Sequence, residues 1–186
     1  MKPPKPKKCK ICKEQFLPQR ALQTICSIQC SIEYASRKKA QKQRIERREA
    51  KEKAKTRGQW LKEAQAAFNA FIRARDKDKP CVSCGRFHEG QYHAGHYRAT
   101  SVAPALRFNE ENVHKQCAPC NNHKHGNLLE YRIRLINRIG GELVEWLEGN
   151  HPPAKYSVHD LKEIKSKYSK MARDIGNKYF RPEHPG

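Results

Sequence analysis

The stretch that decides the fold is "NVHKQCAPCNNHKHGN", residues 112–127. Its sixteen positions include two cysteines, three histidines, two lysines and a tandem pair of asparagines. Thiolate and imidazole are the usual ligands of zinc, and CxxC is the spacing of a zinc knuckle. Imidazole is also the side chain best suited to acid–base catalysis near neutral pH. The stretch therefore predicts a structural metal clamp, the edge of a catalytic site, or both.

The cysteines extend this pattern over the whole chain. The 186 residues contain eight cysteines in four close pairs, which combine into two sets of four. The first set is Cys9, Cys12, Cys26 and Cys30, and the second is Cys81, Cys84, Cys117 and Cys120. The chain begins with "MKPPKPKK" rather than an apolar signal segment, and it has no run of about eighteen apolar residues. We therefore expect an intracellular, soluble protein with two structural Zn²⁺ sites rather than disulfides.

The charge of the chain predicts a polyanionic partner rather than a membrane. There are 39 Lys and Arg against 19 Asp and Glu, which gives a formal net charge of +20 at pH 7. Residues 37–57, "RKKAQKQRIERREAKEKAKTR", concentrate this charge in strong helix formers, with Ile45 as their one large apolar side chain. Because such a helix has no apolar face for docking, we expect a solvated linker that contacts nucleic-acid phosphates.

The spacing of apolar residues predicts the remaining elements. Helical periodicity predicts an amphipathic helix over residues 59–75, whose apolar stripe is Trp60, Ala64, Phe68, Phe71 and Ile72. Further helices are predicted in "NLLEYRIRLINRIGG", ended by Gly140 and Gly141, and around residues 143–147. A long helix follows Ser157, with Asp160 making a capping-box-like start. Short strands are expected in "QYHAGHYRAT" and "VHKQC", with a helix beginning near Asn121. We divide the chain into a cysteine finger (1–36), a basic helical linker (37–58), a main domain with its packing helix (59–149) and a C-terminal amphipathic helix (150–186).

The second cysteine set encloses residues that resemble the HNH, or ββα-metal, nuclease motif. His96 is followed by Asn112, by CxxC at Cys117 and Cys120, and by Asn121 with His125 four positions beyond. This match covers roughly residues 81–130. "FNAFIRARDKDKPCVSCG" and "AGHYRATSVAPALRFNEENVHKQCAPCNNHKHGNL", with the cysteine finger and basic linker, are similar to the NinG (Rap) recombination proteins of lambdoid phages over nearly the whole chain.

The resemblance implies a fold class and a set of roles. The fold would be α+β and mainly helical, with a small ββα-metal core, a Cys₄ zinc knuckle, flanking helices and a separate N-terminal zinc finger. His96 would be the general base, and Asn112 would orient its imidazole through the amide. Asn121 and His125, one turn apart on the following helix, would hold a catalytic Mg²⁺ or Mn²⁺.

One position departs from the motif. Many HNH sites have an Asp or His ligand immediately before the general base, where this chain has Gly95. His93 is a candidate replacement if a bulge at Gly95 turns it to the face of His96, and His123 is a second candidate. Cations near the motif are candidates for DNA-phosphate contacts: Arg98, Arg107, Lys115 and Lys124.

The NinG resemblance implies a DNA endonuclease that cleaves branched recombination intermediates such as Holliday junctions and D-loops. It would act in the cytoplasm of the bacterial host, at the nucleoid, on branched or single-stranded DNA, with phage or host recombination proteins as candidate partners. Two alternatives stay open: an HNH restriction or nicking endonuclease, and a non-catalytic zinc protein that binds nucleic acid. Symmetric cutting of two strands would need two active sites and hence a homodimer, for which the C-terminal helix is a candidate interface.

Overall fold

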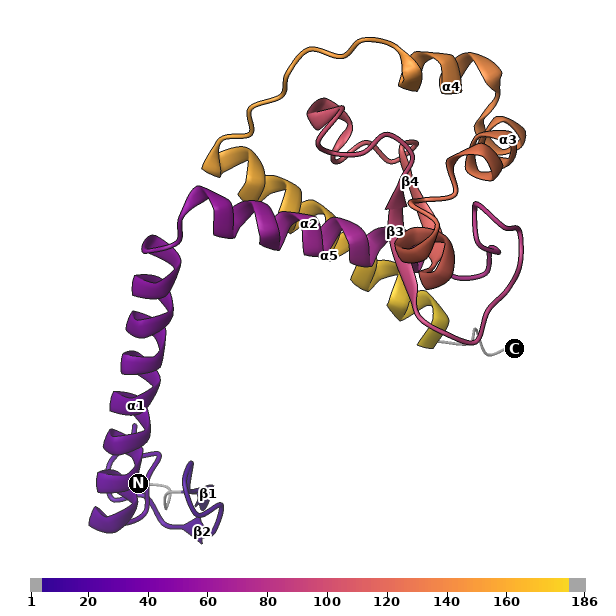
Figure 1. The fold of residues 1–186 in the computed structure, drawn as a ribbon. Coiled ribbons are helices and arrows are strands. Elements are labelled where there is room, and N and C mark those ends of the chain that lie inside the picture. Colours follow the sequence, from indigo (N-terminus) through magenta and orange to yellow (C-terminus); the bar gives the residue numbers. More distant parts are fainter. Residues whose placement is uncertain (1–4, 181–186) are drawn as a thin grey trace. The chain divides into compact units, whose positions relative to one another are not determined.

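The computed structural model describes residues 5–180, with side chains through residue 177. The chain forms two compact units, Met1–Lys55 and Thr56–Gly186. It is of mixed α/β class, about half helical, with two small two-stranded sheets (Figure 1). Among the described residues, none of the helices combines the length and the apolar content needed to cross a membrane.

The N-terminal unit is built around its cysteines. Strands β1 (Lys7–Lys8) and β2 (Gln15–Phe16) pair antiparallel, and helix α1 (Ile28–Lys53) follows. Ser27 caps α1 by accepting a hydrogen bond from the backbone N–H of Cys30. Cys9 and Cys30 are buried, whereas Leu22 and Ile28 are largely exposed. The cysteine cluster therefore takes the place of a hydrophobic core in this unit.

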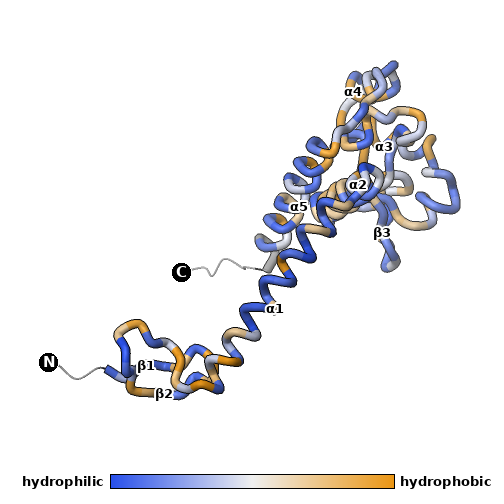
Figure 2. The backbone as a smooth tube through the Cα atoms, turned by 90° about the vertical axis from the view of Figure 1, so that its left-hand side faces the viewer, coloured by the Kyte–Doolittle hydropathy of each residue, from blue (hydrophilic) through white to orange (hydrophobic). Residues whose placement is uncertain are grey.

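Helix α1 continues from the cysteine finger through the basic segment that the sequence predicts to be a helical linker. Every residue from 35 to 51 is exposed, and Figure 2 shows most of the helix in the blue of hydrophilic residues. Two i,i+4 ion pairs, Glu33 with Arg37 and Lys42 with Glu46, lie on its surface. Such pairs stabilise a helix by only a few tenths of a kcal/mol each, so the cations stay available to solvent and to ligands.

The second unit is organised around helix α2 (Arg57–Arg75), which packs along helix α5 (Val158–Phe180) (Figure 1). The predicted apolar stripe of α2 is buried, and Phe68 meets the ring of Tyr168 edge-on at 4.7 Å. Helix α5 begins with reciprocal hydrogen bonds between Ser157 and Asp160, as the sequence predicts. The C-terminal helix therefore belongs to the core of this unit.

A β-hairpin lies against α2. Strand β3 (Tyr92–His96) pairs antiparallel with strand β4 (Val113–Cys117), and the register runs without interruption from Tyr92–Cys117 to His96–Val113. The connection contains a single 3₁₀ turn, η1 (Pro104–Leu106). All five residues of β4 are buried, so this strand lies in the interior of the unit.

The prediction of a helix that begins near Asn121 is wrong about where that helix starts and how far it runs. A single π-helical turn, η2 (Pro119–His123), follows β4, and helix α3 (Leu128–Ile139) begins only after a break. The backbone has positive φ at three successive residues, His125, Gly126 and Asn127. Glycine and asparagine tolerate this conformation, but an α-helix cannot continue through it. Helix α4 (Gly141–Glu148) then follows Gly140, where the sequence predicts that α3 ends.

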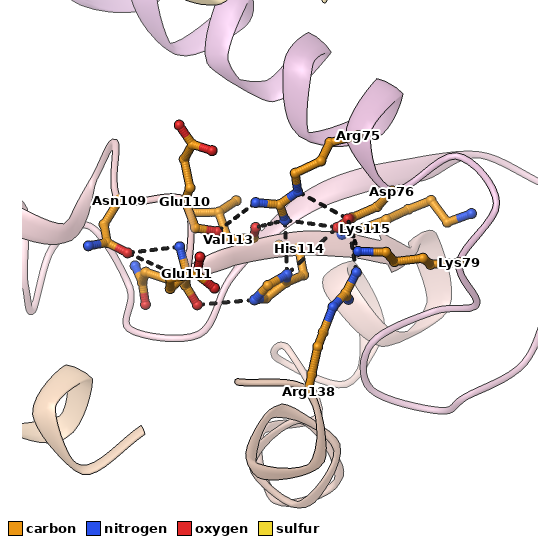
Figure 3. Close-up of polar contacts among 12 residues, drawn as sticks. Arg75, Asp76, Lys79, Asn109, Glu110, Glu111, Val113, His114, Lys115 and Arg138 are labelled. Carbon is orange, nitrogen blue, oxygen red and sulfur yellow. Dashed lines mark hydrogen bonds and ion pairs between the residues drawn. The ribbon is translucent and has the colours of Figure 1, made fainter. Parts of the chain in front are cut away.

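Asp76, at the C-terminal end of α2, is fully buried and joins three elements (Figure 3). Its Oδ2 accepts a hydrogen bond from the backbone N–H of Lys115 in β4 at 3.1 Å and one from Arg75 at 3.0 Å. Its Oδ1 accepts from Arg138 of α3 at 2.9 Å and lies 3.3 Å from Lys79 Nζ. One carboxylate thus ties α2, β4 and α3 together.

The charge of Asp76 is stabilised by its neighbours. Burial alone would raise the pKa of this carboxyl, but the neighbouring His114 ring, the hydrogen bonds from Arg75 and the charges of Arg75 and Arg138 hold it well below the usual range. The His114 ring is buried, with Nδ1 2.9 Å from Arg75 and Nε2 3.0 Å from the carbonyl oxygen of Glu111. Asp76 is therefore ionised and fully surrounded by donors.

We expect Asp76→Asn to lower the free energy of unfolding by about 3–5 kcal/mol, because the guanidinium groups of Arg75 and Arg138 lose their buried counter-charge. Urea denaturation followed by circular dichroism measures this loss. Asp174→Asn, at an exposed position of α5, is the matched control and should change stability by no more than about 0.5 kcal/mol. Equal losses in the two variants would contradict the role given to Asp76.

Candidate metal centres and catalytic pocket

The first cysteine cluster has the dimensions of a zinc site. The sulfur atoms of Cys9, Cys12, Cys26 and Cys30 all lie within 4.8 Å of one another, with Cys12–Cys26 and Cys26–Cys30 at 3.6 Å. Tetrahedral Zn²⁺ with bonds of about 2.3 Å places its sulfurs about 3.8 Å apart, whereas a disulfide needs about 2.05 Å. All eight cysteines are free, so this cluster could hold zinc.

The second cluster joins the start of the hairpin region to its end. Its four sulfurs also lie within 4.8 Å, with Cys84 and Cys117 at 3.9 Å, so it too could hold zinc. Burial raises the pKa of the Cys81 thiol, but backbone N–H donors at Cys84 and Cys117 outweigh it and lower the pKa overall. The lowered pKa favours the Cys81 thiolate, whereas burial raises the pKa of the Cys117 and Cys120 thiols. His88 lies beside this site, with Nε2 3.2 Å from Cys84 Sγ.

A pocket of about 420 Å³ gathers the main site residues predicted from the sequence. His96 reaches it from β3, Asn121 from η2, and His125 from the turn after η2. Asn121 donates through Nδ2 to Asn122, and within residues 5–180 no hydrogen bond engages its Oδ1. The sequence offered no signal for several polar residues that complete the lining: Gln65, Asn69 and Thr100.

The contacts of His96 define the tautomer of its ring. Its Nε2 lies 3.0 Å from the carbonyl oxygen of Arg107. Because a carbonyl oxygen only accepts, Nε2 carries the proton and Nδ1 of the neutral ring is left as an acceptor. Burial lowers the pKa of His96, more than the hydrogen bond to Arg107 raises it. The imidazole is therefore unprotonated at neutral pH, the state that a general base requires.

Asn112, predicted to orient the His96 imidazole through its amide, hydrogen-bonds to the backbone around that ring. The Asn112 side chain is fully buried. Its Oδ1 accepts from the N–H of Arg98 at 2.8 Å, and its Nδ2 donates to the carbonyls of Arg98 and Leu106, each at 3.1 Å. None of these described bonds goes to the imidazole itself, so any orienting effect of Asn112 on His96 is indirect. Asn112 donates to the carbonyl of Leu106, and the carbonyl of the next residue, Arg107, accepts the hydrogen bond from the His96 ring.

The two candidate replacements for the ligand missing at Gly95 lie away from the pocket. No bulge interrupts β3, so strand alternation places His93 on the face opposite Ala94 and His96, which line the pocket. His123 is exposed and does not line the pocket. Both predictions are therefore wrong as to position, because the regular register turns one ring away and the π-helical turn directs the other to solvent.

Gly95 is required by the packing of Gln116. A β-carbon at residue 95 would overlap the Gln116 amide oxygen and would lie 2.9 Å from Cδ and 3.0 Å from Cβ of that side chain. Gln116 is fully buried and donates through Nε2 to Ser83 Oγ at 2.6 Å and to the Gly126 carbonyl at 2.5 Å. It cannot move without losing these bonds. Position 95 therefore has no room for a ligand-bearing side chain.

The predicted DNA-contacting cations divide into two groups. Lys115 is buried, donates to the Lys77 carbonyl at 2.7 Å and lies 4.4 Å from the centre of the Tyr92 ring. The prediction that Lys115 contacts DNA phosphate is wrong, because its ammonium group is buried and already bound within the fold. Arg107 lines the pocket, Arg98 lines the groove beside it, and Lys124 is exposed after η2. None of these three is buried, although Arg98 donates to the Glu148 carbonyl and Arg107 to Gln65 Oε1.

Two four-cysteine clusters that could hold zinc, with a His–Asn pocket on a β-hairpin, define a basic cysteine-cluster protein of mixed α/β class. The chain belongs to the NinG family: the family model described as Bacteriophage Lambda NinG protein matches residues 1–178. The predicted NinG resemblance is thereby confirmed.

Curated relatives are similar over almost the whole length. The chain is 45% identical over 200 residues to Protein ninG of Escherichia phage 933W and 44% identical over 202 residues to Protein ninG of Escherichia phage lambda. Each comparison covers 95% of this chain and 97% of the relative. Protein ninG of Salmonella phage P22 is 42% identical over 187 residues, which cover 88% of this chain and 90% of that protein. No solved structure matches the chain.

The clusters predict a zinc content of two ions per chain. Cys12→Ser and Cys117→Ser should each bind one, because each removes a ligand from a different cluster. Metal analysis of protein purified without chelators measures this, and each variant serves as the control for the other. Loss of both ions in either variant, or a wild type that contains disulfides and no zinc, would contradict the assignment.

The packing around Gly95 predicts that Gly95→Ala lowers the free energy of unfolding by about 1–3 kcal/mol, because the added carbon displaces Gln116 from its hydrogen bonds. Gly90→Ala is the matched control, since a β-carbon there meets nothing within 4 Å. Thermal unfolding compares the two variants. If Gly95→Ala unfolds at the same temperature as Gly90→Ala, the proposed constraint is absent.

Proposed function

We propose that the chain is a metal-dependent, structure-selective DNA endonuclease of the HNH (ββα-metal) kind. Its substrates would be branched recombination intermediates, such as Holliday junctions and D-loops, in phage recombination. One observation carries the proposal: His96, Asn121 and His125, from three separate segments, line one pocket on a strongly basic chain. A neutral base and two candidate metal ligands at one site are the components that phosphodiester hydrolysis requires.

His96 would activate the attacking water. In hydrolysis the water oxygen forms a bond to phosphorus, the bond from phosphorus to the leaving sugar oxygen breaks, and a proton of the water passes to Nδ1 of His96. The leaving oxygen then takes a proton from solvent. The hydrogen bond from Nε2 to the Arg107 carbonyl keeps Nδ1 as the accepting atom throughout. Arg107 also lines the pocket, where its guanidinium can bind the phosphate.

Asn121 and His125 would hold the catalytic divalent ion. An amide oxygen suits Mg²⁺ and Mn²⁺, and an imidazole suits Mn²⁺ better than Mg²⁺. A site with few protein ligands leaves coordination positions for phosphate oxygens and water. The bound ion would stabilise negative charge on the phosphate and on the leaving oxygen. Zinc in the two cysteine clusters would be structural.

The charge distribution supports DNA as the substrate. Arg98, Arg107 and Lys124 lie at or near the pocket, and the second half of α1 is an exposed basic surface. Binding through phosphate contacts should weaken steeply with salt. The chain would act in the host cell on branched or single-stranded DNA, with a homodimer required if two strands are cut symmetrically.

Cleavage assays with His96→Ala test the proposal. Labelled four-way junction, D-loop and linear duplex are incubated with Mg²⁺, with Mn²⁺ and without added divalent ion, and zinc content is checked in each sample. We expect His96→Ala to lose about 10²–10⁴-fold in cleavage rate. His123→Ala, which removes an exposed histidine outside the pocket, is the matched control and should cleave as well as wild type.

Three outcomes would contradict the proposal. Equal cleavage by wild type and His96→Ala would show that His96 is not the general base. Equal cleavage of junction and linear duplex would favour a restriction or nicking enzyme, and binding without cleavage in either metal would favour a non-catalytic nucleic-acid-binding protein.

A further inference from the structure

A second cavity, a groove of about 480 Å³, continues from the candidate catalytic pocket. The two share His96 and His125. The groove extends past Val102 in the loop after β3 and Leu128 at the start of α3, which are 66% and 50% exposed. Apolar side chains open to solvent therefore lie directly beside the residues proposed to act on the phosphate. Nothing in the hydrolytic chemistry requires them there.

The charge in the groove indicates which part of a nucleic acid it would accept. Glu148 lines it, and hydrogen bonds from Arg132 and Tyr97 lower the pKa of this carboxyl and keep it ionised. Arg98, the one arginine in the lining, donates to the Glu148 carbonyl oxygen at 3.0 Å. The guanidinium groups of Arg132 and Arg98 already have acceptors on Glu148, and apolar walls do not solvate a phosphate. The groove therefore suits an uncharged, flat group, whereas the phosphate is better placed in the pocket beside Arg107.

We propose that this groove binds an unpaired nucleobase adjacent to the scissile phosphate, with Val102 and Leu128 packing on the base. The inference rests on the proposed function and adds the residues that make it selective for DNA structure. Because the cavities share two histidines, a strand with a phosphate in the pocket places a neighbouring base at the groove. In a duplex the base faces are stacked and covered, and exposing one costs a few kcal/mol. At a branch point or in a single strand the face is already free.

The test measures binding without cleavage, so that it does not depend on catalysis. Full-length protein without added divalent ion is titrated into a fluorescently labelled fork with unpaired arms and into fully paired duplex of the same sequence. A 2-aminopurine at the first unpaired position reports stacking of the base. Leu128→Ala is expected to weaken binding to the fork by about tenfold and to abolish the 2-aminopurine signal, with duplex binding unchanged.

Leu129→Ala is the matched control. Leu129 is the next residue of α3, is 83% exposed and does not line the groove, so the variant should bind both DNAs like wild type. Leu128→Phe keeps an apolar surface and should therefore retain fork binding. Zinc content and circular dichroism check that each variant is folded.

The proposal is overturned if Leu128→Ala and Leu129→Ala bind the fork equally. It is also overturned if Leu128→Ala weakens fork and duplex alike, or if it changes the sedimentation of the protein, which would make the patch a protein interface. Absence of cleavage by wild type would refute the proposed function but would leave the difference between fork and duplex binding to be judged on its own.

Discussion

The second unit depends on one buried negative charge. The carboxylate of Asp76 accepts hydrogen bonds from the backbone of β4 and from arginines on α2 and α3. These hydrogen bonds hold the three elements together at one point. A buried carboxylate is tolerated only when its lone pairs are filled, and here the backbone N–H of Lys115 and the side chains of Arg75, Arg138 and Lys79 fill them. The hairpin is therefore placed by electrostatics at one end and by the apolar packing of α2 against α5 along its length.

The second cysteine cluster and the candidate pocket share one segment of the chain. Cys117 ends β4, Cys120 lies within η2, and Asn121 follows it directly. Gln116 joins the knuckle to the far side of the pocket by donating both to Ser83 and to the Gly126 carbonyl. A metal bound by the four thiolates would therefore hold η2 in position. The clamp and the candidate catalytic edge are consecutive parts of the same stretch of chain.

Patterns that depend on local spacing could be predicted from the sequence. The apolar period predicted α2 and α5, Gly140 the end of α3, and the cysteine pairs the two clusters, because each depends on residues close together along the chain. The pocket was predicted only in part. The motif supplied His96, Asn121 and His125, but not the polar residues that α2 contributes, because nothing in a helix sequence marks which side chains will face a hairpin.

Particular errors had a common physical origin. Lys115 looked like a surface cation, but β4 is covered on both faces, and the tertiary fold buries it. His93 needed a bulge that the register does not contain. The sequence by itself determined the helical periods, the metal-binding spacing and the family, since these are properties of neighbouring residues. Only the tertiary structure decided which polar groups share a pocket and which are buried and hydrogen-bonded in the core, because burial depends on residues that are distant in sequence.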